Sequence, residues 1–566
     1  MLRLRRDRTR PGRLSRPTLP GPGVAALSFV LFAVAATAVS CRKETRVERA
    51  AREKILLLGN GAEPKALDPH LVSSVGDANI LRALFEGLVA YHPESDTVHE
   101  PGVAERWAAN EDFSQWRFFL RADAKWSNGE PVTAHDFVYS YHRILHPEMA
   151  APYASMLYFL KNAEAFNKGE LEDFAEVGVE AVGDHELVCT LERPAPFFPD
   201  VVKHTTWLPV HRGTIERHGV MTDNYTDWQK PGNHVGNGPF ALSEWRINAH
   251  VKVRRNPHYW DAAAVKLNGV DFYPIESAFT EEKAFRNGLI HLSYTMPENL
   301  IARYREMEDS PLRIETYNGS YFYRCNVKKA PTDNADFRRA LALAIDRSVI
   351  VDYVTRGGQT PAHGFTPPSE EGYQPPGDLG LDLAKAGEHL RRAGYADGGE
   401  VPEFTILINT SEAHKNIAMA IQDMWRKNLG ISRIRIENQE WKVFQQTVLD
   451  GAYEVSRAGW IGDYVDPETF LGMWVTGDSN NNTGWSSADY DRLMRESSLL
   501  SDPARRYAKL AEAEAVLLDE LPVIPIYWYT RVYLLHPDVR NWHPLLLDNR
   551  PYKHIDLEPA PKGGPR

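Results

Sequence analysis

Cysteine is scarce in this chain of 566 residues, which contains only three. At most one disulfide can therefore form within the chain. Cys189 alternates with Leu187 and Leu191 in a pattern typical of a strand, which favours a buried thiol. Whether Cys189 pairs with Cys325 depends on their separation in the fold, which the sequence does not give. The third cysteine, Cys41, belongs to a different context, described below.

The chain also lacks the short motifs of common enzyme classes. It contains no G-x-S-x-G elbow, no H-E-x-x-H helix and no Walker loop. Its 20 histidines are scattered, without the paired spacing of a zinc site. We therefore expect a protein that is not an enzyme and that carries no metal or other cofactor. The alternative is a secreted hydrolase, and the lack of these motifs argues against it.

Positive charge is in short supply, since the net charge at neutral pH is −11. The first 40 residues hold seven arginines and one aspartate, so the rest of the chain is more acidic still. An acidic surface argues against binding to nucleic acid, which requires the neutralisation of phosphates. The hydrophobic content of 43% in a chain of this length is enough for more than one core.

The N-terminus reads as a targeting segment, because its arginines precede an apolar run from Val24 to Val39. This run is shorter than the roughly 20 residues of a spanning helix. It ends at Ser40 and Cys41 in a sequence that resembles a lipobox, although Ala38 replaces the usual leucine. We predict a lipoprotein signal peptide over 1–40, lipidation of Cys41, a linker over 41–53 and a location outside the cytoplasm. An uncleaved anchor and an ordinary signal peptide are the alternatives.

Helical and strand patterns alternate along the chain, which predicts a mixed α/β protein. Apolar residues alternate with polar ones over 116–120, as in a half-buried strand. Asp502 followed by Pro503 marks a helix start. An apolar stripe over 417–429 predicts another helix, which Gly430 ends. The Pro- and Gly-rich stretch 357–380 is expected to be a surface loop.

Residues 457–464 combine a carboxylate, a guanidinium and an indole around two glycines. Asp463 and Arg457 supply opposite charges, Trp460 supplies a flat apolar face, and Gly459 lets backbone approach a ligand closely. This combination suits a small zwitterion. The alternative is that Asp463 and Arg457 form an ion pair with each other.

Five further motifs accompany this segment. Together, and in the order in which they occur, they resemble the periplasmic oligopeptide-binding proteins of solute-binding protein family 5. The resemblance runs from about residue 55 to about residue 545. The motifs are Trp126, Asn128, Gly129, Pro131, Val132, Thr133, Ala134, Asp136, Phe137 and Arg143; Asn237, Gly238, Pro239, Phe240 and Trp245; Arg255, Asn256, Pro257, Tyr259 and Trp260; Arg338, Ala340, Leu341, Ala344, Ile345, Asp346 and Arg347; and Gln439, Glu440, Trp441, Lys442 and Phe444.

The resemblance implies a periplasmic-binding-protein-like fold of type II, with two hinged lobes and an extra inserted domain. Two strands crossing between the lobes would act as the hinge. Some members of the family have a cysteine pair at the positions of Gly319 and Ile461, so that bridge is absent here. The implied divisions are 54–85, 207–318 and 531–566 for lobe I, 86–206 for the inserted domain, and 319–530 for lobe II.

The resemblance also implies a set of ligand contacts. Asp463 would hold the α-amino group of a peptide, and backbone near Ser73, Val75 and Gly459 would pair with the peptide backbone as an added strand. Aromatic residues would line the side-chain pockets, although each of them is also a common core residue. These aromatic residues are Trp441, Trp460, Tyr317, Phe322 and Tyr529.

The resemblance weakens where the family holds the peptide carboxyl end with cations. Val448 and Thr355 occupy two of the matching positions. His414 is the clearest retained member, with help from Arg457, although an exposed histidine at a helix start is an equally simple interpretation. Fewer cations predict a ligand whose C-terminus is not held tightly, such as a longer peptide or a cell-wall peptide with a modified end.

The function implied is that of a monomeric extracytoplasmic lipoprotein which captures oligopeptides between two lobes. It would deliver them to the permease and ATPase of an ABC importer. The leading alternative is another cargo on the same scaffold, such as a cell-wall peptide, a dipeptide, a metal chelate or a sugar. A secreted hydrolase is the second alternative.

Overall fold

The computed structural model describes residues 44–72, 74–369, 372–377, 379–500 and 502–559. The predicted signal peptide, Cys41 and Ser73 lie outside these ranges. Every element below belongs to the compact unit formed by residues 46–566. Within the described ranges, no helix has both the length and the apolar character needed to cross a membrane.

A four-stranded sheet is built from segments far apart in the sequence. Its order is β1-β10-β9-β8, with β1 parallel to β10 and the other pairs antiparallel. The predicted linker overlaps helix α2, which buries Val47 in the core, so residues 46–52 are part of the fold. The elements are α2 (Arg46–Arg52), β1 (Ile55–Gly59), α3 (Val75–Leu84), α7 (Arg212–His218), β8 (Phe240–Arg246), β9 (His250–Arg255), β10 (Gly269–Tyr273), α8 (Ala278–Arg286) and α9 (Glu298–Arg305).

A second four-stranded sheet lies within residues 104–190, in the antiparallel order β4-β5-β7-β6. Its strand β5 buries Trp116, Phe118 and Leu120 on one face, which confirms the predicted alternation. The elements of this region are β2 (Val89–Tyr91), β3 (His99–Pro101), β4 (Ala104–Ala109), β5 (Gln115–Leu120), α4 (Ala134–Leu145), α5 (Ala163–Asn167), β6 (Val179–Ala181), β7 (Glu186–Thr190) and α6 (Phe198–Val201).

A six-stranded mixed sheet has the order β12-β16-β11-β15-β13-β14. The predicted helices at 503 and 417 are present, with Asp502 as the N-cap of α17 and Gly430 in left-handed conformation after α13. The elements are β11 (Leu312–Cys325), α10 (Ala335–Leu343), α11 (Arg347–Val349), β12 (Thr360–Pro361), α12 (Leu383–Arg392), β13 (Phe404–Asn409), α13 (Glu412–Leu429), β14 (Ile434–Gln439), α14 (Trp441–Leu449), β15 (Val455–Ile461), α15 (Glu468–Leu471), α16 (Ala488–Ser498), α17 (Pro503–Glu520) and β16 (Val523–Leu534), followed by β17 (Val539–Arg540) and β18 (Asp556–Leu557).

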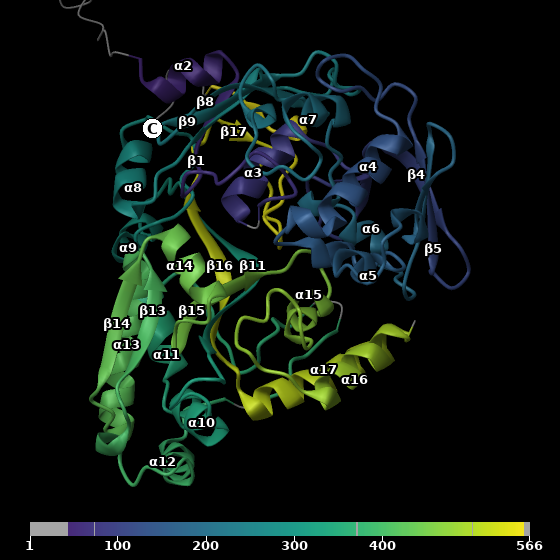
Figure 1. The fold of residues 1–566 in the computed structure, drawn as a ribbon. Helices are drawn as coiled ribbons and strands as arrows, with labels where there is room; N and C mark the ends of the chain where they lie inside the picture. The colour runs from purple at the N-terminus through teal and green to yellow at the C-terminus, as the bar shows by residue number, and fades with distance from the viewer. Residues whose placement is uncertain (1–43, 73, 370–371, 378, 501, 560–566) are drawn as a thin grey trace, which may run out of the picture. The chain divides into compact units, whose positions relative to one another are not determined.

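Strands β11 and β16 are the longest in the fold and link the two halves of the compact unit (Figure 1). At one end, Leu312 pairs with Leu534 beside the first sheet, and at the other, Arg324 pairs with Val523 inside the six-stranded sheet. The register of this antiparallel ladder shifts between Thr316 and Ser320. The ladder is thus irregular where it passes from one half to the other.

The buried apolar side chains form two large cores. One draws on residues 51–292 and 533–557, while the other draws only on residues 321–527. Cys189 belongs to the first core and Cys325 to the second, and both are free thiols. Tyr464 is the exception to this division, because it follows β15 in the sequence but packs in the first core.

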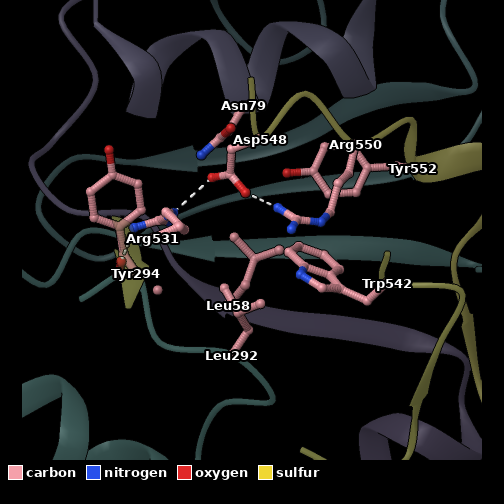
Figure 2. Close-up of a pocket in the computed structure, with 10 residues that line it drawn as sticks. Leu58, Asn79, Leu292, Tyr294, Arg531, Trp542, Asp548, Arg550 and Tyr552 are labelled. Carbon is pink, nitrogen blue, oxygen red and sulfur yellow. Dashed lines mark hydrogen bonds and ion pairs between the residues drawn. The ribbon is translucent and has the colours of Figure 1, made fainter. Parts of the chain in front are cut away.

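A cluster of buried ion pairs fixes the C-terminal segment against β11 and β16. Arg531 on β16 lies 2.8 Å from Asp548, and the same carboxylate contacts Arg550 (Figure 2). Arg550 also lies 2.7 Å from Glu315 on β11. Two carboxylates thus compensate two guanidiniums, which removes most of the cost of burying these charges.

The stretch 357–380 is not a simple surface loop. In its described part, the side chains of Phe365 and Tyr373 are 0% and 1% exposed. The carboxylate of Glu514 on α17 accepts hydrogen bonds from the backbone of Phe365 (2.7 Å) and Thr366 (3.1 Å) and from the Tyr373 hydroxyl (2.5 Å). The prediction from Pro and Gly content failed because two aromatic side chains and one buried carboxylate anchor the segment.

Two buried histidines predict loss of stability in mild acid. Burial lowers the pKa of His234 to about 4 and that of His291 to about 3. Both are therefore neutral when folded, and the stabilisation present above pH 6.5 is lost as the pH falls. Between pH 7 and pH 5.5 we expect each to cost about 1 kcal/mol in the free energy of unfolding, measured by urea titration.

The variant His234→Phe isolates one of these contributions. The imidazole packs between Phe85 and Trp228, so a phenyl ring fits the site. We expect this variant to lose about 1 kcal/mol less than the wild type over the same pH range. The exposed His185→Phe should retain the full pH dependence. Equal slopes in wild type and His234→Phe would contradict the assignment.

Candidate functional site

Asp463 lies in the loop between β15 and α15. Its backbone amide donates to Thr469 Oγ1 at 2.9 Å, and this hydroxyl donates in turn to Asp463 Oδ2 at 3.4 Å. Oδ1 lies 3.3 Å from His204 Nε2, and the aspartate side chain is only 12% exposed. In the described ranges no lysine or arginine forms an ion pair with it. Since a carboxylate can accept about four hydrogen bonds, Asp463 retains capacity for a cationic ligand group.

Arg457 does not pair with Asp463. On β15 it lies opposite Tyr323 of β11, so its side chain is on the same face of the sheet as Tyr321 and Tyr323. The guanidinium lies 5.5 Å from the centre of the Tyr321 ring, and its buried Nε has no hydrogen-bond partner. The alternative of an Asp463–Arg457 ion pair is therefore not what the structure shows.

His414 lies at the start of α13, on the same side as Arg457. Its Nδ1 is 3.4 Å from the Tyr321 hydroxyl. Burial lowers the pKa of His414 well below its ordinary value, and the charge of Arg457 adds to this effect. His414 is therefore neutral at pH 7. This corrects the expectation that it serves as a cation, although its ring can still form hydrogen bonds.

Tyr529 lies beside Gly459, and Tyr317 lies next to Tyr529. The rings of the two tyrosines are 6.3 Å apart and edge to face. A Cβ atom on Gly459 would lie 2.6 Å from the Tyr529 hydroxyl, so a larger residue there would require the Tyr529 ring to shift. The structure thus brings together four of the residues expected from the sequence, namely Arg457, Gly459, Tyr317 and Tyr529.

Tyr153 and His204 join the site without having been expected. The Tyr153 ring stacks on the imidazole of His204 at 5.7 Å and on the indole of Trp460 at 6.0 Å. Trp460 is fixed by a 2.8 Å hydrogen bond from its Nε1 to the carbonyl of Thr469. Nothing in the sequence near Tyr153 or His204 marks them, since they lie more than 250 residues before Asp463. Only the fold brings them to it.

Two of the expected aromatic residues, Phe322 and Trp441, pack against other aromatic side chains of the protein. Phe322 is 0% exposed and packs on Phe365 at 4.9 Å and on Trp474 at 5.9 Å. These contacts place it in the second core. Trp441 is half-buried at the start of α14, where it stacks on Phe444 at 5.8 Å. Phe322 is therefore a core residue in this arrangement.

The remaining expected positions are apolar or lack contact with β15. Val448 is buried in a small cluster with Phe444, and Thr355 donates a 2.9 Å hydrogen bond to Gln359. Val75 is the first residue of α3, and no hydrogen bond joins the described part of residues 72–76 to β15. The pKa of the neighbouring Asp77 is raised by burial to about 6, and the charge of Lys442 on α14 partly opposes this, so α3 and α14 lie within electrostatic reach.

The loop after β15 is held against residues 193–204. Tyr464 stacks on Phe197 at 5.7 Å, and Arg193 lies 3.1 Å from Glu468. Arg506 binds the same loop through Asp466, with two contacts of 2.6 and 2.8 Å. These contacts hold Asp463 and Trp460 close to Tyr153 and His204.

Comparison with known proteins gives a consistent family assignment. The family described as bacterial extracellular solute-binding proteins, family 5 Middle, matches residues 99–482. The chain is similar to the periplasmic oligopeptide-binding protein OppA of Salmonella typhimurium, with 35% identity over 538 residues that cover 94% of this chain and 96% of that protein.

Solved structures give the same result. A crystal structure of Haemophilus influenzae OppA in complex with RPPGFSPFR has a TM-score of 0.83 at 35% identity, covering 89% of this chain and 99% of that one. The Escherichia coli murein tripeptide binding protein MppA has a TM-score of 0.84 at 32% identity, covering 90% and 99%. Its unliganded open form scores only 0.64, with 90% and 98% covered. The arrangement described here is thus less similar to the open form.

Proposed function

Because the chain belongs to family 5 of the bacterial extracellular solute-binding proteins, we propose that it captures oligopeptides outside the cytoplasm for an ABC importer. Proteins of this family bind substrates and are not enzymes. The fold is the periplasmic-binding-protein-like arrangement predicted from the sequence. Two of the similar proteins, OppA and MppA, are named for binding peptides.

The carboxylate of Asp463 is the observation that carries the proposal. It is mostly buried and has one histidine as its neighbouring ionisable group within ion-pairing distance. Tyr153 and Trp460 form an apolar wall beside it. A peptide ammonium placed here would gain a charge-assisted hydrogen bond in a largely desolvated site, and the wall would receive an adjacent apolar side chain.

Isothermal titration of the lipid-free protein, residues 42–566, tests this function. The protein is first unfolded and refolded to remove any bound ligand, and then titrated with a pool of tri- to pentapeptides. We expect saturable binding near the micromolar range, about 8 kcal/mol, since an importer must release its cargo. The same pool with acetylated amino ends should give no saturation. If neither pool binds, the protein carries another cargo on this scaffold.

The carboxyl end of the ligand is expected to be bound weakly. Val448 and Thr355 carry no charge and His414 is neutral, which leaves Arg457 as the charged group of the expected set. Amidation of a pentapeptide should therefore change its dissociation constant by less than about threefold, under 1 kcal/mol. Paired titrations of free-acid and amidated peptides measure this change. A loss of tenfold or more would show that the C-terminus is held.

We also infer the division into lobes that the sequence suggested. Lobe I would combine 54–85, 207–318 and 531–566, the inserted domain would be 86–206, and lobe II would be 319–530. The separate core of residues 321–527 and the shifted register between Thr316 and Ser320 support a hinge in β11 and β16. Closure about this hinge would bring Asp463 of lobe II to Tyr153 and His204 of the inserted domain.

The membrane partners follow from the N-terminal segment and the family. Cleavage after Ser40 and lipidation of Cys41 would anchor a periplasmic monomer, which would pass its cargo to a permease and ATPase. Metabolic labelling with a radioactive fatty acid tests the anchor. Label in the wild type and none in Cys41→Ser would support it, whereas a soluble, unlabelled wild type would exclude it.

A further inference from the structure

Arg324 on β11 is a half-buried arginine without a carboxylate partner among the described residues. Its Nε is fully buried and has no hydrogen-bond partner. No hydrogen bond or ion pair in the described residues involves its side chain, which lies 5.9 Å from the centre of the Phe322 ring. The guanidinium therefore has donors that no described protein group occupies, and these can bind a ligand carboxylate.

The five arginines that are almost fully buried in the described residues each have a partner. Arg143 pairs with Asp68, Arg506 with Asp466 and Glu468, and Arg550 with Glu315. Arg338 and Arg347 have no carboxylate, but backbone carbonyl groups accept hydrogen bonds from both. Arg324 has neither kind of partner, and together with Arg457 it leaves two uncompensated positive charges in adjacent strands.

Arg324 is on the same side of the sheet as Trp460. It lies opposite Ser456 in the β11–β15 pairing, while Trp460 lies opposite Ser320, and side chains at even spacing share a face. Burial raises the pKa of Tyr153 well above its ordinary value, the charge of Asp463 raises it further, and the charge of Arg324 opposes them. The Tyr153 hydroxyl is thus within electrostatic reach of both Asp463 and Arg324.

A bound peptide can extend from Asp463 to Arg324. An extended chain advances about 3.3 Å per residue, so a peptide held by its amino group at Asp463 passes Tyr153 within its first few residues. A side chain directed at the face of Trp460 then meets the guanidinium. Burial lowers the pKa of Arg324 from its ordinary value, and the charge of Arg457 adds to this effect, so a ligand carboxylate next to the guanidinium would stabilise its charged form.

We propose that Arg324 selects peptides with an acidic side chain at one position between the second and the fourth residue. A carboxylate there can form two parallel hydrogen bonds with the guanidinium and supply the missing counter-charge. The proposal rests on the peptide-binding function proposed above, and it adds a substrate class to that function. It requires a side chain and not the peptide C-terminus, so amidated peptides separate these two sources of carboxylate.

The test is a titration series with amidated pentapeptides. All-alanine pentapeptide amide is compared with versions that carry glutamate or glutamine at position 2, 3 or 4. We expect glutamate to bind at least about tenfold more tightly than glutamine at one of these positions, and about equally at the others. Equal affinities at all three positions would overturn the proposal while leaving peptide binding intact. If neither these amides nor the matching free-acid peptides bind, the proposed function itself is refuted.

Variants of Arg324 assign the preference to this side chain. Arg324→Gln should bind the all-alanine peptide as the wild type does but lose the preference for glutamate. Arg324→Lys should keep part of it, and Arg324→Glu should favour lysine at the same position. Arg303→Gln removes an exposed arginine on α9 and should change nothing. A preference that survives in Arg324→Gln would overturn the assignment, and this reading does not depend on the other variants being folded.

Discussion

Replacing Asp463 with asparagine is expected to weaken the binding of peptides with a free amino end by about ten- to a hundredfold. The amide is nearly isosteric with the carboxylate, so Thr469 can still contact it, but the negative charge is lost. A hydrogen bond to a charged group contributes about 1.5–3 kcal/mol, which corresponds to this loss. Isothermal titration of both proteins with one pentapeptide measures it.

A thermodynamic cycle separates the amino group from general damage to the site. Acetylation of the peptide should weaken binding to the wild type strongly and binding to Asp463→Asn hardly at all, since the partner is already gone. Asp309→Asn changes an exposed aspartate outside the site and should bind like the wild type. Equal effects of acetylation on wild type and Asp463→Asn would show that another group holds the amino end.

Replacing Asp68 with alanine is expected to lower the free energy of unfolding by about 3–5 kcal/mol. The side chains of Asp68 and Arg143 are both 0% exposed, with contacts of 2.7 and 3.1 Å between them. Burial alone would raise the pKa of Asp68, but Arg143 and His70 together more than offset this and lower it. Without Asp68 the buried guanidinium on α4 has no counter-charge.

Urea titration at pH 7 measures this loss, and two further variants interpret it. The double variant Asp68→Ala with Arg143→Met removes both charges and should recover part of the stability. Asp489→Ala breaks an exposed ion pair with Arg492 and should cost less than about 1 kcal/mol. A loss from Asp68→Ala as small as that from Asp489→Ala would mean that Arg143 finds water or another acceptor.

Much of the fold could be predicted because its signals are local. The end of α13 at Gly430 and the start of α17 after Asp502 each depend on backbone geometry within a few residues. Both boundaries are where the sequence predicted them. The family resemblance placed longer-range features well. Gly319 and Ile461, named as the positions of a cysteine pair in some relatives, are opposite each other in the β11–β15 pairing.

Several residues that carried the resemblance hold the fold together. Asn237 bonds with the backbone of Glu86, Asn256 donates to the carbonyl of Gly238, and Arg143 pairs with Asp68. These contacts explain why such residues identify a scaffold. They carry no information about cargo, which is why the sequence left the ligand open.

The site was predicted less completely, because its properties depend on tertiary contacts. Tyr153 and His204 reach Asp463 only through the packing of residues 193–204 on the loop after β15. The charge state of His414 follows from its burial beside Arg457, which no pattern in the sequence shows. Phe322 is in the core because it packs on Phe365 and Trp474, which are distant from it in the sequence.

The two free thiols can be used to measure local opening of the protein. Cys189 and Cys325 are each 0% exposed in different cores, and burial raises the pKa of both, that of Cys325 to about 12. In the lipid-free protein, residues 42–566, Cys41 is absent, so a thiol reagent can modify a cysteine only when its own core opens. Labelling rates at the two sites would therefore show whether one half of the molecule melts before the other, and whether a bound peptide couples them into one cooperative unit, without any engineered probe.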